Sequence, residues 1–175
     1  NSIVNIDNLS DLYNIIEIIN RYPNKNFLIL IRFNFDFKDN FFSRFGLEPN
    51  SPELIKSLEI ISKQNNLKIE GLHTHSTRPD KSPSIFLSKL NALINFYQKN
   101  REHLNNLRYI DIGGGFYGKM DENIKSQFKD IIPKFEDYGE ILGKTMKNIF
   151  PNEEIELIIE PGVALTANIL DYFVK

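Results

Sequence analysis

Short apolar runs alternate along the chain with longer amphipathic stretches in which apolar residues recur at helical spacing. The apolar runs have the length of buried strands. This alternation predicts βαβ units around a parallel sheet, because parallel neighbours need a long crossover between them. The predicted strands are Ser2–Ile6, Asn26–Asn34, Leu67–His73, Leu107–Ile112, Glu154–Ile159 and Ala167–Val174. The predicted helices are Asn8–Arg21, Ser51–Asn65, Ser84–Lys99, Asn123–Ile132 and Tyr138–Asn148.

Two of the predicted helices begin with capping signals. Ser51 precedes Pro52, which places an N-cap hydroxyl before a proline in the first turn. Asn8 or Ser10 can cap the first predicted helix. Strands that alternate with helices fit either a (β/α)8 barrel or a doubly wound sheet. Because no linker or repeat divides the chain, we expect a single α/β domain over residues 1–175.

The composition is that of a globular protein without thiol chemistry. The 175 residues are 41% hydrophobic, carry a formal charge of −2 and contain no cysteine. Disulfides, thiolate metal sites and cysteine nucleophiles are therefore excluded from this chain. The balanced charge gives no electrostatic case for nucleic acid or an anionic membrane, and no apolar run reaches the ~18 residues of a membrane span. We expect a cytoplasmic protein. A complete barrel takes about 250 residues, so a barrel here would be partial.

Polar side chains and glycines gather where the predicted strands end. The second strand contains Arg32, the third runs into His73–Ser76, the fourth runs into Gly113–Gly115, and the next is followed by Glu160–Gly162. The carboxyl ends of parallel strands lie on one side of the sheet, where the active sites of α/β proteins form. We therefore expect these residues to share one site.

The glycine run has three interpretations. Gly113, Gly115 and Gly118 match G-x-G-x-x-G directly after a strand. A dinucleotide site also needs a helix that starts at the glycines and an acidic residue about 20 positions later, at the end of the next strand. No strand is predicted at that distance. The remaining interpretations are a tight turn with positive φ and a cradle of backbone N–H groups around a phosphate.

His73 and His75 lie two positions apart, so on a strand they would face the same side and could share a metal ion. Such a site usually needs further histidines, and the only other one, His103, lies in a polar stretch. Alternatively, one histidine packs while the other faces the barrel, or an imidazole stacks on a planar ligand. Glu160 follows an apolar strand, where a nearly buried carboxylate needs a partner. It either bonds neighbouring backbone or faces a cationic ligand atom.

Taken together, the three features describe a site for pyridoxal 5′-phosphate (PLP). Glycine N–H groups would bind the phosphate and an imidazole would stack on the ring. A carboxylate would keep the pyridine nitrogen protonated, which makes the ring an electron sink. The sequence therefore favours PLP as the cofactor.

The motifs resemble, in their order and spacing, those of the fold-type III PLP-dependent decarboxylases, the ornithine/diaminopimelate/arginine decarboxylase group. The matching stretches are Ile29–Asn34, Ser43–Leu47, Gly71–Ser76, Asp111–Phe116, Glu160–Gly162 and Ala164–Asn168. This resemblance implies a partial, alanine-racemase-like (β/α)8 TIM barrel. It also implies PLP as cofactor, decarboxylation of an amino acid, and a homodimer.

The resemblance also implies roles for six positions in holding the cofactor. Arg32 lies near the ring, His75 stacks on it and Glu160 pairs with the pyridine nitrogen. The phosphate binds the three glycines Gly113, Gly114 and Gly115. No metal ion is implied. The family's Schiff-base lysine lies on an earlier strand and its β-domain follows the barrel, so we expect both outside this chain, which would then carry no catalytic residue of its own.

Two positions depart from the family pattern. Thr77-Arg78 stands where the family tends to place Gly-Ser, and Val163 stands where it commonly has Arg. The first change removes a hydroxyl for the phosphate, and the second removes a cation that Arg78 could replace.

Three functions stay open on the sequence. The first is a PLP-dependent decarboxylase of which this chain is the middle-to-late barrel portion, inactive alone. The second is a non-catalytic, decarboxylase-like binding module. The third is a metal-dependent barrel hydrolase that uses His73 and His75. The sequence does not select the substrate or distinguish decarboxylation from racemisation.

Overall fold

Within the residues that the computed structural model describes (3–37, 43–76, 80–120, 122–126, 132–152 and 154–166), five parallel strands form one sheet in the order β1-β2-β3-β4-β5. The strands are β1 (Val4–Ile6), β2 (Phe27–Arg32), β3 (Leu67–His73), β4 (Tyr109–Gly114) and β5 (Glu156–Glu160). The long helices are α1 (Leu9–Arg21), α2 (Pro52–Ser62), α3 (Pro83–Lys99) and α5 (Phe135–Ile149). Two short helices are α4 (Glu122–Lys125) and α6 (Val163–Thr166).

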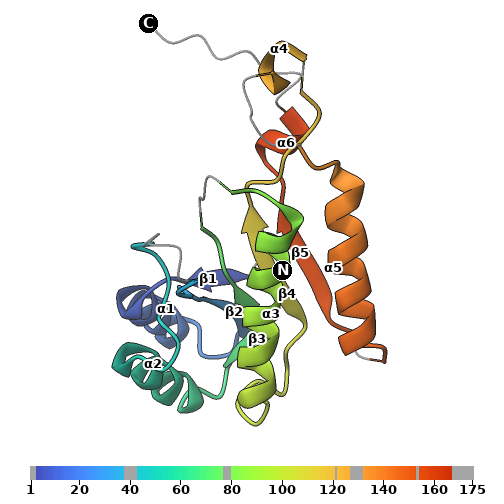
Figure 1. Cartoon of the computed structure of the whole chain (residues 1–175). Helices are drawn as coiled ribbons and strands as arrows, with labels where there is room; N and C mark the ends of the chain where they lie inside the picture. The colour runs from blue at the N-terminus through green and yellow to red at the C-terminus, as the bar shows by residue number, and fades with distance from the viewer. Residues whose placement is uncertain are drawn as a thin grey trace, which may run out of the picture.

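The order of the strands in the sheet follows their order in the chain. A doubly wound sheet instead reverses its strand order near the middle. Sequential order with right-handed crossovers places the connecting helices on one face, as in a segment of a (β/α)8 barrel. Figure 1 shows α1 and α2 at the left, α3 beside them and α5 at the right. Helix α1 packs on α2, and α3 packs on α5. The predicted partial barrel is confirmed.

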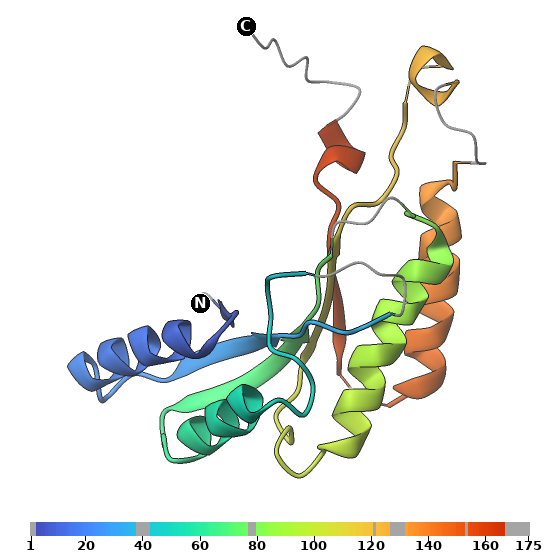
Figure 2. The ribbon, with the colours of Figure 1, turned by 60° about the vertical axis from the view of Figure 1, so that its left-hand side comes forward.

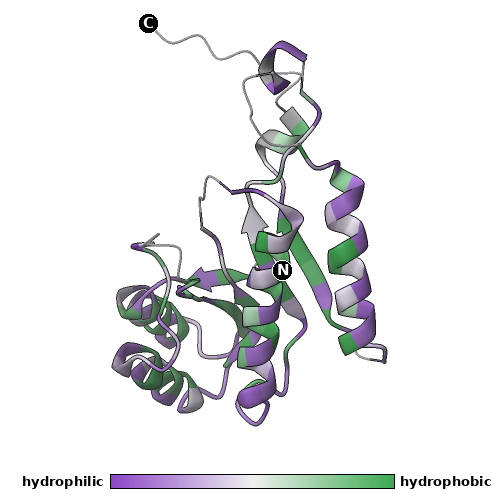
Figure 3. Cartoon of the chain, viewed as in Figure 1, coloured by the Kyte–Doolittle hydropathy of each residue, from purple (hydrophilic) through white to green (hydrophobic). Residues whose placement is uncertain are grey.

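The hydrophobic core lies between the sheet and these helices. Helix α1 buries Leu12, Ile15 and Ile19, which lie one turn apart on a single face. Strand β2 buries Ile29 and Ile31. Figure 3 shows the result, with apolar strands and with helices that are apolar along one side and polar along the other. No helix in the described ranges is long and apolar enough to cross a bilayer.

The predicted helix caps are present. The Asn8 side chain accepts a hydrogen bond from the Asp11 N–H at 3.0 Å, which makes Asn8 rather than Ser10 the N-cap of α1. Ser51 caps α2 by accepting from the Leu54 N–H at 3.1 Å. Each cap fixes where its helix begins, and therefore where the preceding loop leaves the strand.

Two strands end later than predicted. Strand β4 includes Gly113 and Gly114, which were expected after the strand. An irregularity between Asp111 and Gly114 lets the ladder continue to a pairing of Gly114 with Glu160. Glu160 is therefore the last residue of β5 rather than the residue after it. The glycines extend the sheet because β5 approaches β4 too closely for a side chain at Gly114.

The helix predictions near the C-terminal half also need correction. Helix α5 begins at Phe135 instead of Tyr138, because the Asp137 side chain accepts from the Lys134 N–H at 2.8 Å and caps the helix there. Ile132 is not helical, so the predicted helix over 123–132 is wrong at that end. Helix α6 was not predicted. The predicted strand Ala167–Val174 lies outside the described residues.

Candidate functional site

The residues singled out by the sequence converge at the carboxyl ends of neighbouring strands. Arg32, His73, Gly114 and Glu160 are the last residues of β2, β3, β4 and β5. In the sheet register Arg32 pairs with His73 and Gly114 pairs with Glu160. In Figure 2 the segments after β4 and β5 leave the sheet together on this side. His75 lies two residues beyond β3, so the predicted gathering of these residues is confirmed.

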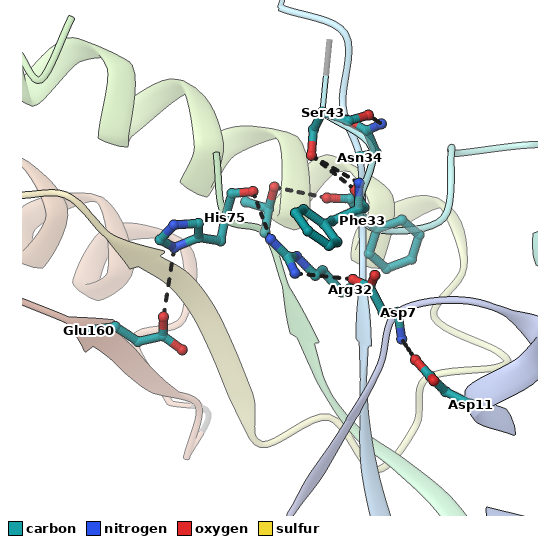
Figure 4. Close-up of polar contacts among 10 residues, drawn as sticks. Asp7, Asp11, Arg32, Phe33, Asn34, Ser43, His75 and Glu160 are labelled. Atoms are coloured by element: carbon teal, nitrogen blue, oxygen red, sulfur yellow. Dashed lines mark hydrogen bonds and ion pairs between the residues drawn. The ribbon is translucent and has the colours of Figure 1, made fainter. Parts of the chain in front are cut away.

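Arg32 contacts three separate segments of the chain at the carboxyl ends of the strands. Its guanidinium donates to the Asp7 carboxylate at 3.1 Å and to the His75 backbone carbonyl at 3.3 Å (Figure 4). The same group lies 5.0 Å from the centre of the Phe45 ring. Its side chain is only 18% exposed, so the Asp7 pair is partly shielded from water. Arg32 therefore holds the loop that carries His75.

The His75 imidazole is neutral and its tautomer is fixed. Its Nδ1 accepts a hydrogen bond from the Gly114 N–H at 3.1 Å, so this nitrogen carries no proton. The Glu160 carboxylate 3.7 Å away is then a polar neighbour rather than a full ion-pair partner (Figure 4). Burial and the positive charge of Lys89 lower the pKa of His75, against the opposing charge of Glu160. A neutral, fixed imidazole suits stacking on a planar ring.

The glycines allow close contact with His75 and leave open space beyond it. Gly113 has φ +69°, and a Cβ there would lie 2.5 Å from His75 Nδ1. Gly115 has φ +96°, and a Cβ there would meet nothing within 4 Å. Both conformations favour glycine over residues with a side chain. The backbone next to Gly115 is therefore accessible to a ligand, as a phosphate cradle requires.

Asp111 is a buried residue of β4 that forms a hydrogen bond with the backbone of the glycine turn. It is 4% exposed, and its carboxylate accepts from the Gly113 N–H at 2.8 Å. Burial raises the pKa of Asp111 to about 6, with the Gly113 hydrogen bond opposing and the charge of Glu160 adding to the rise. The sequence gave Asp111 no role of its own. The structure makes it the residue that fixes Gly113.

Glu160 is more accessible than its sequence suggested. We expected a nearly buried carboxylate, but the side chain is 48% exposed. The reason is its strand, since β5 is at the edge of the sheet formed by the described residues. Its carboxylate nevertheless lies beside His75 and Asp111 at the strand ends. It is placed to meet a cationic atom of a ligand that rests on His75.

His73 is a buried packing residue. It is 5% exposed, and within the described chain neither ring nitrogen has a hydrogen-bond partner. Burial, with Arg32, His75 and Lys89 adding positive charge, lowers the pKa of His73 to about 3. Its imidazole is therefore neutral. The third histidine, His103, is exposed, as its polar surroundings predicted.

The structure adds Glu160 to the two histidines that the sequence offered as ligands of a metal ion. His73, His75 and Glu160 can each offer a ligand atom, and these atoms lie within 4.8 Å of one another. Three donors are enough for a catalytic zinc site. His75 and Glu160 also belong to the PLP interpretation, so geometry alone leaves both interpretations open.

A cavity of about 350 Å³ opens at the strand ends, and we call it the strand-end cavity. Its size is within the range of small-molecule and cofactor sites. The lining includes His75, Ser76, Lys89, Gly114, Gly115 and Glu160. A larger hollow of about 510 Å³ lies beside Pro133 and Phe135, away from every predicted site residue. A flat imidazole, accessible glycine backbone and a half-exposed carboxylate around one cavity fit PLP.

Lys89 was missed by the sequence analysis. It lies on α3 with 2% of its surface exposed, and its ammonium donates to the Ser76 carbonyl at 3.4 Å. Its signal was a lysine three residues after Phe86 and four before Leu93, on the apolar face of the helix. The predicted replacement cation, Arg78, and its neighbour Thr77 lie outside the described residues. Val163 begins α6.

Comparison with known proteins identifies a family. Residues 1–167 match the model of the pyridoxal-dependent decarboxylases, in the pyridoxal-binding domain. The chain is 27% identical over 126 residues to the diaminopimelate decarboxylase of Aquifex aeolicus, covering 72% of this chain and 27% of that protein. It is 28% identical over 177 residues to the probable chloroplastic diaminopimelate decarboxylase of Oryza sativa subsp. japonica, covering 94% and 33%.

The fold has the same relatives. The crystal structure of diaminopimelate decarboxylase from M. jannaschii in complex with L-lysine superimposes with a TM-score of 0.71 at 21% identity. The match covers 93% of this chain and 38% of that one. At this identity the likeness concerns the fold alone. The chain spans about a third of the length of the relatives that it matches.

Proposed function

The chain belongs to the pyridoxal-dependent decarboxylases, and we propose that it forms the PLP-binding part of a diaminopimelate decarboxylase. The observation that carries the proposal is the strand-end cavity, where His75, Gly115 and Glu160 meet. The choice of diaminopimelate rests on the two curated relatives, both of which carry that activity in their names. Ornithine and arginine are the competing substrates.

Each site residue has a distinct task in this proposal. PLP, when bound, supplies the electron sink for removal of an α-carboxylate. The backbone at Gly115 binds the phosphate, because the N–H groups of Gly113 and Gly114 already donate to Asp111 and His75. The His75 imidazole supports the ring from one face. Glu160 holds a proton on the pyridine nitrogen, because a carboxylate next to that nitrogen stabilises its protonated form. Arg32 acts indirectly, because it holds the backbone carbonyl of His75 in place.

Several expectations from the sequence stay predictions. These are the single domain over residues 1–175, the homodimer, the cytoplasmic location, and the position of the Schiff-base lysine outside the chain. The two edge strands of the described sheet, β1 and β5, are the places where further strands of a barrel would pair. The non-catalytic module and the metal-dependent hydrolase are the alternatives that the following experiment separates.

The experiment measures CO2 release by the whole decarboxylase of which, in this proposal, the chain is the PLP-binding part. The assay offers meso-diaminopimelate, ornithine and arginine separately, with and without added PLP. We expect PLP-dependent release from diaminopimelate. Glu160→Gln should lower kcat about 10–100-fold, because it removes a charged hydrogen-bond acceptor from the ring nitrogen. Glu156→Gln, at the other end of β5, is the matched control and should leave kcat unchanged.

Three outcomes would contradict the proposal. Release from ornithine or arginine alone would reject the substrate. The absence of any release would favour the binding module. Hydrolytic activity that follows stoichiometric zinc instead of PLP would favour the metal-dependent alternative.

A further inference from the structure

We propose that the strand ends also bind a divalent transition-metal ion such as Zn²⁺, held by His73, His75 and Glu160, and that this ion and PLP exclude one another. The metal site is independent of the proposed function, whereas the competition with PLP rests on it. One ligand atom from each of the three side chains lies within 4.8 Å of the others. Two histidines and one glutamate are a ligand set that zinc sites use.

His73 is the residue that points to a bound ion. It is 5% exposed, yet within the described chain neither of its ring nitrogens has a hydrogen-bond partner. A buried polar group without a partner is costly, and an ion that completes it is one of the few explanations for its presence. A leucine would pack at the end of β3 without that cost. A metal ion bound to one ring nitrogen would give this buried imidazole a function.

The three donors need little movement to reach one ion. Zinc bonds of about 2.1 Å place the ligands of a tetrahedral site roughly 3.4 Å apart. His73 and His75 have ring centres 6.4 Å apart. The Glu160 carboxylate is 3.7 Å from His75 Nδ1, and its side chain is half-exposed, so it can rotate toward the ion. The ligand set is therefore assembled at the ends of β3 and β5.

The charges around these donors are compatible with a cation. The positive charges of Arg32 and Lys89 act on the two histidines, but Arg32 is paired with Asp7 at 3.1 Å. The carboxylate of Asp111 lies beside that of Glu160. When all five groups are ionised, three carboxylates face two cations. A divalent ion therefore meets a site with a small excess of negative charge.

The ion and PLP would compete for the same two groups. The His75 nitrogen that lies near Glu160 is Nδ1, which accepts a hydrogen bond from the Gly114 N–H at 3.1 Å. A neutral imidazole has one such lone pair, so Nδ1 binds either the Gly114 N–H or an ion. Zinc would thus release the imidazole from the orientation that supports the ring and would occupy the carboxylate meant for the pyridine nitrogen. The hydrolase alternative makes the ion a catalyst, whereas here it is an inhibitor of PLP binding.

The test measures metal binding and cofactor competition separately. Equilibrium dialysis gives the stoichiometry and Kd of Zn²⁺ for the 175-residue chain, and Co²⁺ in its place reports tetrahedral ligation by its visible absorption. We expect one ion per chain. His73→Leu should weaken zinc binding about 100-fold or more, because even a partner that only orients a metal ligand contributes about 10–100-fold. 4′-Deoxypyridoxine 5′-phosphate has the ring and phosphate of PLP without the aldehyde that could chelate the metal, and it should displace Co²⁺.

Matched variants separate the ligands from other histidines and from folding. His103→Gln removes an exposed histidine outside the site and should match the wild type. Glu160→Ala, at a half-exposed position, repeats the test if His73→Leu does not fold. No zinc binding by the wild type, or equal zinc binding by the wild type and His73→Leu, would reject the site. Simultaneous binding of Co²⁺ and the PLP analogue would reject the competition. Failure of the metal-free chain to bind the analogue would instead reject the proposed function.

Discussion

Acidification from pH 7 to pH 4 is expected to lower the free energy of unfolding by roughly 3 kcal/mol through His73 alone. His73 is buried without a hydrogen-bond partner among the described residues, and its pKa falls from 6.5 to about 3. Below pH 6.5 the unfolded chain therefore takes up a proton that the folded protein excludes. Stability from His73 is complete above pH 6.5 and is lost progressively as the pH falls toward 3.

Asp111 has the opposite effect over part of the same range. Its pKa rises from 3.8 to about 6, so between these values the folded protein binds a proton that the unfolded chain releases. This group stabilises the fold by roughly 2 kcal/mol as the pH falls from 7 to 4. The wild type should therefore show a much smaller net change than His73 alone would cause.

The two contributions are separated by comparing variants. Urea unfolding of the wild type, His73→Leu and Asp111→Asn is measured at pH 7 and at pH 4. His73→Leu should gain roughly 3 kcal/mol relative to the wild type over this interval, since only the Asp111 effect remains. Asp111→Asn should lose stability relative to the wild type. A difference between wild type and His73→Leu that does not change with pH would show that His73 titrates normally.

Replacing Gly114 with alanine is expected to destabilise the fold by about 3 kcal/mol or more. A Cβ at this position would lie 2.1 Å from the carbonyl oxygen of Glu160, which is backbone and cannot move aside as a side chain could. The added methyl would force β4 and β5 apart where Gly114 pairs with Glu160. PLP binding should fall with stability, because the same pairing places Glu160 beside the glycine turn.

Gly139 in α5 provides the matched control for this substitution. It is exposed, and a Cβ there would meet nothing within 4 Å. Gly139→Ala should raise the free energy of unfolding by about 0.5–1 kcal/mol, because alanine favours the helix interior. Urea unfolding followed by circular dichroism measures both variants. Equal stability of the Gly114→Ala and wild-type chains would mean that β4 and β5 do not pair as described.

Much of this fold was predictable because its signals are local. Ser51 and Pro52 fix the start of α2 through neighbouring atoms, and the alternation of apolar runs with amphipathic stretches reports the parallel sheet. The choice between a barrel segment and a doubly wound sheet was not predictable from those signals. It depends on strand order, which is set by packing between segments far apart in the chain.

The gathering of the candidate residues at the strand ends was predictable, but their surroundings were less so. The ends of the predicted strands indicated that His75, the glycines and Glu160 lie together, because parallel strands bring their carboxyl ends to one side of the sheet. The sequence could not place Gly114 inside β4, since that depends on how closely Glu160 approaches. It also missed Lys89, whose burial results from contact between α3 and the loop after β3. Such contacts join segments that no short motif connects.

Hydrogen–deuterium exchange of the 175-residue chain, with and without PLP at about 100 times its Kd, tests most directly whether PLP binds at these strand ends. Ligand binding at that excess stabilises the bound state by about 2.7 kcal/mol, so amides that exchange through local opening of the site can slow up to about 100-fold. We predict the greatest slowing in residues 73–76, 113–118 and 159–165, with much less in α1 and α2. No slowing, or slowing greatest in α1 and α2, would contradict a PLP site at the ends of β3, β4 and β5.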